Sequence, residues 1–273
     1  MTLHGVNRSS FEYACVQWGA THEGPIDAAS IRAMTAWNIN VVRLPLNASC
    51  WLARADYRSD VLGYVTRLHA AGLYVILDLH WDRTGQEKLP DPKLAPRFWS
   101  SVAKALHKDH RVMFDLYNEP HDVTWTAWHA SMQRLVDAVR ATGAKTPLMV
   151  GGLGWANDLS GWLKWRPADP DHQLVASFHL YNFTTCASMA CWNATVLPVA
   201  KKFPVVTGEL GENDCTADFI NTYMPWADAH DISYLGWTWN TWDCKSGPAL
   251  ISSYDGTPTA FGAGFKAHLL SLP

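Results

Sequence analysis

Residues 73–80 read LYVILDLH, an apolar run that ends on the polar residues Asp78 and His80. Continuous runs rich in Val, Ile and Leu are typical of strands that are buried on both faces of a parallel sheet. A helical pattern follows at 93–107, and the next apolar run, 111–118 (RVMFDLYN), again ends on a polar residue. Strand, helix and strand in this order indicate a βαβ unit.

The same alternation extends over the rest of the chain in both directions. We predict strands at 3–7, 40–45, 73–80, 111–118, 147–151, 173–180, 204–208 and 232–239, and helices at 27–37, 59–71, 93–107, 125–142, 157–163, 194–202, 216–230 and 259–270. Eight strand–helix repeats in 273 residues predict an α/β fold, a (β/α)8 TIM barrel, as a single catalytic domain over residues 1–273. The alternative, a doubly wound open sheet, would carry a glycine-rich phosphate turn after its first strand, where this chain has NRSS.

The composition fits one large core and excludes several classes of protein. Hydrophobic residues make up 48% of the chain and charged residues 17%, which excludes a disordered protein. A formal net charge of −3 offers no basic surface for nucleic acid, and no apolar run approaches the roughly 18 residues of a membrane span. We therefore expect neither nucleic acid nor a membrane as a partner.

The ends of the predicted strands carry the candidate functional residues, because the active site of a barrel lies at the carboxyl ends of its strands. Polar or aromatic residues stand at or just after most of these ends: Asn7, Arg43, His80, Asn118, Glu119, His179, Tyr181, Glu209, Trp239 and Trp242. The chain also contains 15 Trp, and flat aromatic faces suit the apolar faces of sugars. Further candidates for stacking, with packing under loops as the alternative, are Trp18, Trp51, Trp81 and Trp155.

Two carboxylates stand out among these residues. Glu119 follows the fourth predicted strand and Glu209 the seventh, so a closed barrel places them across its mouth from each other. Two carboxyl groups about 5–5.5 Å apart suit double displacement at the anomeric carbon of a sugar. The alternative is that both form structural ion pairs, for example with Arg43. Glu212 and Asp214 are rival carboxylates that we expect to serve the loop or the rim, since they lie beyond the strand end.

Seven motifs in fixed order give the chain a close resemblance to glycoside hydrolase family 5, the cellulase-like retaining β-glycosidases. They are HGVN (4–7), VVRLPL (41–46), LDLHW (77–81), YNEP (117–120), FHLY (178–181), TGELGE (207–212) and GWTWNTWD (236–243). The resemblance covers almost the whole chain. The ordered series is far more specific than any one motif in it.

The resemblance implies a role for each residue at the strand ends. Glu119 would be the general acid/base and Glu209 the nucleophile. Asn118 would bind the 2-hydroxyl of the sugar. Arg43 would keep Glu209 ionised through a charge-assisted bond, and Tyr181 would donate to the same carboxylate.

The histidines and the tryptophans of the eighth strand would contact the sugar. His80 and His179 would bind hydroxyls or tune the acid/base. Trp242 would be the stacking platform under the sugar that is cleaved, with Trp239 as the alternative. Trp237 and Trp239 share one strand parity and Trp242 has the other, so a bulge or the strand end must reorient one of them.

By the same resemblance we expect a retaining endo-β-1,4-glucanase that acts on a β-linked polysaccharide or oligosaccharide as a monomer, with no cofactor and no metal. Three alternatives stay open. A β-mannanase or another family member would act on mannan, xyloglucan or a glycolipid. A non-catalytic carbohydrate-binding barrel would not need two opposed carboxylates. A metal-dependent barrel hydrolase using Asp78, His80, His179 and a Glu would more often carry His-x-His on its first strand, where His4 stands alone.

The cysteines are even in number and contain no C-x-x-C, which favours disulfides in an oxidising compartment over zinc. Six cysteines allow 15 pairings. Proximity of neighbouring loops in a barrel favours Cys15–Cys50, Cys186–Cys191 and Cys215–Cys244. We therefore expect a secreted protein whose signal peptide is not part of this sequence.

Overall fold

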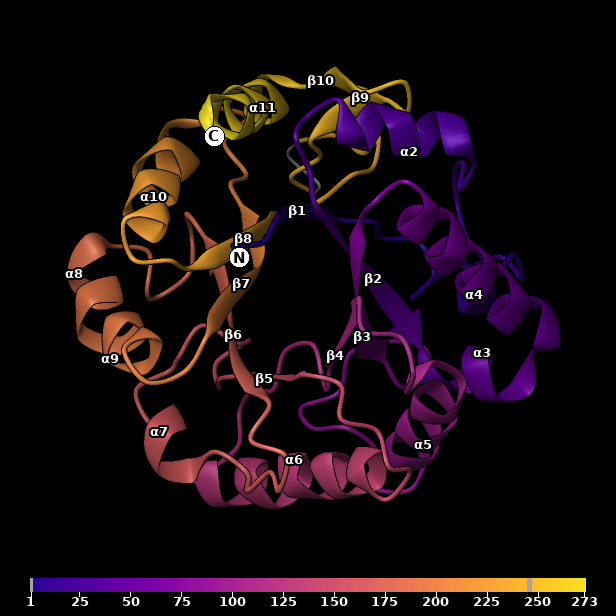
Figure 1. Cartoon of the computed structure of the whole chain (residues 1–273). Coiled ribbons are helices and arrows are strands. Elements are labelled where there is room, and N and C mark those ends of the chain that lie inside the picture. The colour runs from indigo at the N-terminus through magenta and orange to yellow at the C-terminus, as the bar shows by residue number, and fades with distance from the viewer. Residues whose placement is uncertain (1, 245–246) are drawn as a thin grey trace.

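The computed structural model describes residues 2–244 and 247–273. Its centre is a closed barrel in which eight parallel strands follow one another in chain order (Figure 1). The strands are β1 (His4–Asn7), β2 (Val41–Asn47), β3 (Tyr74–Trp81), β4 (Val112–Asp115), β5 (Leu148–Gly151), β6 (Leu174–Tyr181), β7 (Val205–Gly211) and β8 (Ser233–Gly236). The predicted (β/α)8 barrel is confirmed.

Helices surround the barrel as a ring (Figure 1). They are α1 (Ala14–Gln17), α2 (Ala28–Thr35), α3 (Ala48–Ala53), α4 (Ala55–Ala70), α5 (Leu94–Leu106), α6 (Trp125–Arg140), α7 (Trp162–Trp165), α8 (Met189–Cys191), α9 (Leu197–Ala200), α10 (Asp218–Asp228) and α11 (Ala260–Ser271), with a π-helical turn at Trp192–Val196. A small antiparallel hairpin, β9 (Ile251–Ser253) and β10 (Thr257–Pro258), precedes α11. None of the helices in the described ranges is long and apolar enough to cross a membrane.

Several predicted bounds differ from the structure. The strand predicted at 232–239 ends at Gly236, because the Thr238 amide leaves the barrel and donates to the Pro248 carbonyl. The strand predicted at 111–118 likewise ends at Asp115. The helix predicted at 157–163 is only the four-residue α7, since the preceding segment turns back on itself through bridges of Gly152 to Ala156 and of Leu153 to Asp158.

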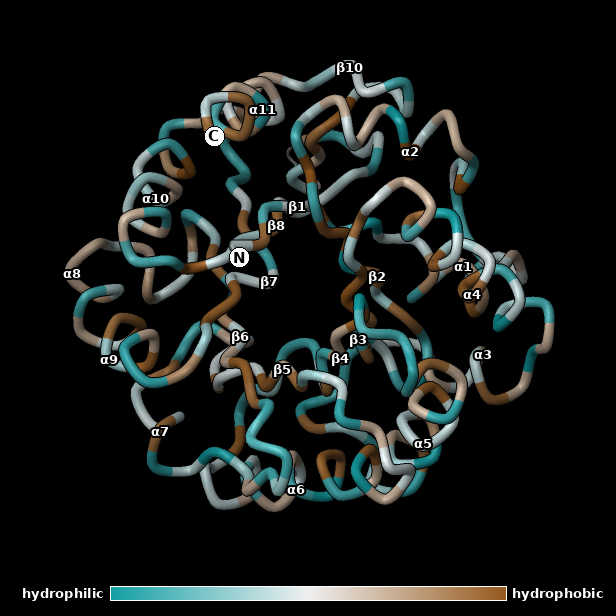
Figure 2. The backbone as a smooth tube through the Cα atoms, viewed as in Figure 1, coloured by the Kyte–Doolittle hydropathy of each residue, from teal (hydrophilic) through white to brown (hydrophobic). Residues whose placement is uncertain are grey.

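Two apolar layers hold the barrel together. The larger core lies between the strands and the helices. In Figure 2, hydrophobic and hydrophilic residues alternate along α6, as expected of a helix with one packed face. A second cluster is formed by Leu3, Val41, Ile76, Met149, Val175, Val206 and Leu235. Residues two apart on a strand share a face, so Arg43, Asp78 and Ser177 continue the inner faces of Val41, Ile76 and Val175. An apolar plug thus closes one end of the barrel and a polar layer lies above it.

Three disulfides tie the loops at the carboxyl ends of the strands. They join Cys15 to Cys50, Cys186 to Cys191 and Cys215 to Cys244, which confirms the predicted pairing. The first joins α1, which follows β1, to α3, the third joins the loops after β7 and β8, and the second closes a short segment after β6.

Candidate active site

A pocket of about 540 Å³ opens at the carboxyl ends of the strands. Both candidate carboxylates, Glu119 and Glu209, line it. Its floor and walls also include His80, Asn118, Tyr181 and Trp237. The pocket therefore lies where a barrel places its chemistry, and it combines polar groups with aromatic faces.

Glu119 and Glu209 face each other in this pocket. One oxygen of each carboxyl group and a ring nitrogen of His179 all lie within 4.8 Å of one another. This close approach fits the short separation between the two carboxyl groups of a retaining glycosidase. Burial raises the pKa of the Glu119 carboxyl above its ordinary value, which favours a carboxylic acid there.

Arg43 lies on β2 beneath the pocket, is fully buried and contacts several of the site residues. Its Nη1 donates to Glu209 Oε1 at 3.1 Å and to Asn7 Oδ1 at 2.9 Å, and its Nη2 donates to Asn118 Oδ1 at 2.9 Å. A guanidinium only donates, so these contacts fix the orientation of both asparagine amides. Arg43 stays charged, because the surrounding carboxylates outweigh its burial and hold its pKa above the ordinary value.

Two aspartates complete the buried charge cluster. Asp115 Oδ2 accepts from Arg43 Nε at 3.0 Å, and Asp78 Oδ2 lies 3.1 Å from Arg43 Nη2. Burial raises the pKa of Asp78 to about 7 and that of Asp115 to about 6. One arginine faces several carboxylates here, so a proton retained on an aspartate lowers the net negative charge below the pocket.

Tyr181 on β6 contacts Glu209 directly, and Asn7 on β1 shares the Arg43 donor with it. The Tyr181 hydroxyl donates to Glu209 Oε2 at 2.5 Å. Burial raises the pKa of Tyr181 well above its ordinary value, so the phenol keeps its proton. Asn7 shares Arg43 Nη1 with Glu209 and donates to the Gly208 carbonyl at 2.8 Å. The expected contacts of Arg43 and Tyr181 with Glu209 are therefore present.

The two histidines hold different parts of the site. His179 Nδ1 lies 3.0 Å from Glu119 Oε1, and His80 Nδ1 lies 2.7 Å from Asp78 Oδ2. Burial lowers the pKa of both rings to about 4, so both are neutral at neutral pH. His80 thus carries its proton on Nδ1, toward Asp78, and leaves Nε2 as an acceptor toward Asn118 Nδ2 at 3.4 Å.

The structure places a different tryptophan of the eighth repeat in the pocket from the two that were predicted. Trp237, directly after β8, stacks on His80 with ring centroids 5.6 Å apart. Trp239 is fully buried and packs edge-on against Trp37, so it has no face to offer a sugar. Trp242 lies beside Tyr13, and neither Trp239 nor Trp242 lines the pocket.

Some of the other candidate tryptophans line the pocket and others do not. Trp155 lines the pocket and stacks on His121 with centroids 4.6 Å apart. Trp51 is buried against Phe98, and Trp18 is exposed outside the pocket. Phe183, 62% exposed over Tyr181, is an aromatic pocket residue that the strand pattern missed because it lies in a loop.

Gln86 is a site residue that sequence reasoning missed. It lies in the loop between β3 and α5, where no strand or helix periodicity marks it. Its side chain contacts both Asn118 and Glu119. Glu212 and Asp214, the rival carboxylates, serve the loop after β7: Glu212 accepts from the Ile220 amide and the Thr216 hydroxyl, and Asp214 from the Thr216 amide.

Of the residues in the metal alternative, Asp78 and His80 lie outside the group that could share an ion, and Asp78 Oδ2 contacts Arg43 and His80. Among the described residues, the acidic and histidine groups close enough to share an ion are Glu119, His179 and Glu209. Both oxygens of Glu209 already accept from Arg43 and Tyr181.

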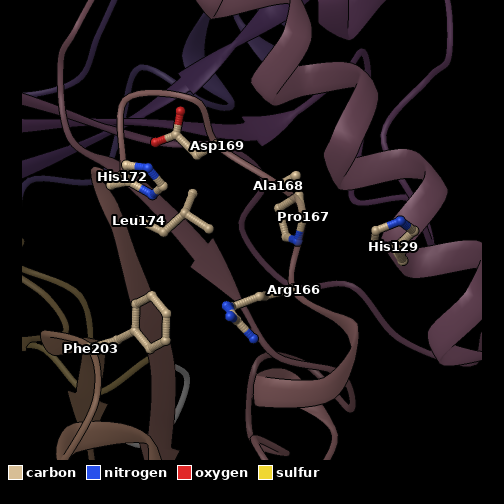
Figure 3. Close-up of a pocket in the computed structure, with 8 residues that line it drawn as sticks. All are labelled: His129, Arg166, Pro167, Ala168, Asp169, His172, Leu174 and Phe203. Carbon is tan, nitrogen blue, oxygen red and sulfur yellow. The ribbon is translucent and has the colours of Figure 1, made fainter.

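A second hollow of about 390 Å³ lies at the opposite end of β6 (Figure 3). It is lined by Leu174, Arg166 and Phe203, with the Arg166 guanidinium 4.8 Å from the Phe203 ring centroid. Leu174 begins β6, whereas Tyr181 ends the strand in the carboxylate pocket. This hollow therefore lies at the amino ends of the strands, which in a barrel serve stability.

Comparison with known proteins identifies a family for almost the whole chain. A model of the family described as cellulase (glycosyl hydrolase family 5) matches residues 2–243. Endoglucanase CelA of Streptomyces lividans is 24% identical over 258 residues, a match that covers 89% of this chain and 54% of that protein. The chain spans about half the length of the first curated relatives that it matches.

Solved structures show the same fold. A hyperthermophilic endocellulase from the archaeon Pyrococcus horikoshii superimposes with a TM-score of 0.82 at 18% identity, over 99% of this chain and 93% of that one. XacCel5A in complex with cellopentaose superimposes with a TM-score of 0.78 at 20% identity, over 98% of this chain and 99% of that one.

Proposed function

Because the chain belongs to the cellulase family, glycosyl hydrolase family 5, we propose that it is a retaining endo-β-1,4-glucanase with Glu209 as nucleophile and Glu119 as general acid/base. One observation carries the proposal: oxygens of the two carboxyl groups lie within 4.8 Å in the pocket. Their environments differ in the way that the two roles require. Glu209 accepts from Arg43 and Tyr181, whereas burial favours the protonated form of Glu119.

The reaction proceeds in two displacements. Glu209 attacks the anomeric carbon while the Glu119 carboxylic acid gives its proton to the leaving glycosidic oxygen, which forms a covalent glycosyl-enzyme. Glu119, now a carboxylate, takes a proton from water, and the water oxygen replaces Glu209 at the same carbon. Asn118 binds the 2-hydroxyl, and Arg43 stabilises the Glu209 carboxylate when it departs.

The substrate class is proposed from the aromatic faces and from the relatives. Trp237 and Trp155 line the same pocket as the two carboxylates, and their rings suit the apolar faces of a glucan chain. The relatives named above are endoglucanases and an endocellulase, and one solved neighbour holds cellopentaose. We propose a soluble or amorphous β-1,4-glucan as the substrate, cleaved within the chain. His80, His179 and Tyr181 complete the proposed binding residues, with Trp237 in place of Trp239 and Trp242.

An extracellular location forms part of the same proposal. Three disulfides at the catalytic end of the barrel persist in an oxidising compartment, where a polymeric glucan is also found. We propose that residues 1–273 form one catalytic domain that acts as a monomer. Size-exclusion chromatography of the oxidised protein tests the monomer directly.

The deciding experiment measures new reducing ends on carboxymethylcellulose, barley β-glucan, xyloglucan and galactomannan, together with the loss of viscosity. We expect activity on the first two, with viscosity falling early, and none in Glu209→Ala. Asp214→Asn, a carboxylate in the loop after β7, is the matched control and should stay active. Hydrolysis of galactomannan alone would identify a mannanase, and binding of a glucan without hydrolysis would identify a binding barrel.

Azide rescue assigns the two carboxylates separately. With an aryl β-cellobioside that carries a good leaving group, azide enters the space left by Glu209→Ala and yields the α-glycosyl azide. In Glu119→Ala the covalent intermediate still forms, and azide yields the β-glycosyl azide. The reverse assignment of anomers would exchange the two proposed roles.

A further inference from the structure

Gln86 links two residues of the pocket from a loop outside the barrel. Its side chain is partly exposed. The amide nitrogen donates to the backbone oxygen of Glu119 at 2.9 Å and to Glu119 Oε2 at 3.2 Å, while the amide oxygen accepts from Asn118 Nδ2 at 3.1 Å. A backbone carbonyl only accepts, so this contact fixes which end of the Gln86 amide faces Glu119.

The amide of Asn118 is fully engaged in this arrangement. Its Oδ1 accepts from Arg43, which settles the orientation of the group. Its Nδ2 has two hydrogens, and two acceptors face it: Gln86 Oε1 at 3.1 Å and His80 Nε2 at 3.4 Å. A sugar hydroxyl can accept from Asn118 only if one of these two bonds is given up.

We propose that Gln86 is a positioning residue that occupies, in the free enzyme, the place of the sugar hydroxyl at Asn118, and that a bound sugar displaces it. The inference rests on the proposed function, because it takes Asn118 as a sugar contact and Glu119 as the acid/base. Gln86 is the partner able to leave, since it lies on a loop between β3 and α5 and its side chain is partly exposed. His80 is 7% exposed, sits on β3 and is anchored to Asp78.

Displacement of Gln86 also changes the proton affinity of Glu119. A donated N–H stabilises a carboxylate, so Gln86 holds the pKa of Glu119 down against the burial that raises it. When the sugar takes its place, that pKa rises and the acid form is favoured at the moment it is needed. The other titratable or charged groups that face Glu119 are Arg43 on β2, Asp78 and His80 on β3, His179 and Tyr181 on β6, Glu209 on β7, and His121 in its own loop.

The test compares pH profiles of the wild type, Gln86→Met and Thr84→Val on cellopentaose. Met has nearly the length of Gln but no amide, and Thr84 is an exposed, uncharged position on the same loop. The profile of kcat/KM reports the free enzyme, and that of kcat reports the complex. In Gln86→Met we expect the basic limb of kcat/KM to move up by about one pH unit and the limb of kcat to stay. Thr84→Val should match the wild type in both.

Equal movement of both limbs would overturn the displacement, because Gln86 would then contact Glu119 in the complex as well. If neither limb moved, the coupling to Glu119 would be wrong, whatever the loss of activity. A 13C NMR titration of the Glu119 carboxyl, assigned with Glu119→Gln, should show the same rise in pKa in substrate-free Gln86→Met. This titration needs no turnover, so it tests Gln86 independently, whereas a wild type that hydrolyses no glucan counts against the proposed function.

Discussion

The Tyr181 hydroxyl donates to Oε2 of Glu209 at 2.5 Å, on the oxygen opposite the one that Arg43 contacts. Both oxygens of the proposed nucleophile are therefore held, one by a cation and one by a phenol. The two donors come from β2 and β6, so the carboxylate is oriented from two sides of the barrel. Such restraint is what an attacking group needs, because a small misplacement costs much of the rate.

We predict that Tyr181→Phe lowers kcat/KM on cello-oligosaccharides by about tenfold to a hundredfold, the range of a lost hydrogen bond to a charged group. The matched control is Tyr223→Phe, which removes a buried hydroxyl that contacts Thr207 on the strand of Glu209 but outside the pocket. The control should lose stability and retain kcat/KM. Equal losses of activity in the two variants would show that Tyr181 acts only through packing.

The tryptophans after β8 should respond to substitution in opposite ways. Trp237→Ala removes the ring stacked on His80 in the pocket, and we expect a loss of about 1–3 kcal/mol in transition-state binding with little change in unfolding. Trp239→Ala empties a fully buried site beside Trp37 and should lower the free energy of unfolding by about 3–5 kcal/mol. Steady-state kinetics and urea unfolding of both variants check the assignment. A stable, inactive Trp239→Ala protein would contradict it.

The contrast between these two tryptophans shows which part of the site the sequence pattern can predict and which part it cannot. Apolar runs that end on polar residues were sufficient to predict the barrel and to bring Glu119 and Glu209 to one mouth, because strand direction and alternation determine both. The strand ends at Gly236, so the alternation of side chains along a strand no longer predicts which tryptophan ring points into the pocket. Packing against Trp37 decides that, and no local pattern reports it.

The role of Gln86 could not be predicted from the sequence for the same reason. Its contacts depend on the path of a loop, and on a backbone oxygen of a residue 33 positions away. The cysteine pairing could be predicted, in contrast, because the order of the strands alone makes the loops after β1 and β2 neighbours.

Glu12 gives the stability of the fold a pH dependence that is separate from catalysis. It is 2% exposed after β1, and its Oε2 accepts from the Ser10 amide at 2.7 Å. Burial raises the pKa of Glu12 from 4.5 to about 8. A raised carboxyl pKa means that the folded state holds a proton that the unfolded state has lost, so its contribution is full below about pH 4.5 and is lost as the pH rises to about 8.

Glu12→Gln cannot titrate and should abolish this dependence. We predict that the variant matches the wild type near pH 5 and becomes more stable than it toward pH 8.5, with the difference reaching on the order of 3 kcal/mol. Urea unfolding across this range, with the exposed Glu87→Gln as control, measures it. A difference that does not change with pH would mean that Glu12 is ionised in the folded protein.

The disulfides should rank differently for stability and for activity. Cys15–Cys50 closes a separation of 35 residues and Cys186–Cys191 one of 5, so loop entropy predicts losses of roughly 4 and 2 kcal/mol in the two double alanine variants. Yet the Cys186 amide donates to Asn157 Oδ1 at 2.8 Å, and Asn157 Nδ2 donates to the His179 carbonyl at 2.8 Å. The short bridge therefore holds a pocket residue and the strand of His179. We expect Cys186→Ala/Cys191→Ala to lose less stability but more kcat/KM than Cys15→Ala/Cys50→Ala, and the same order in both measurements would contradict this.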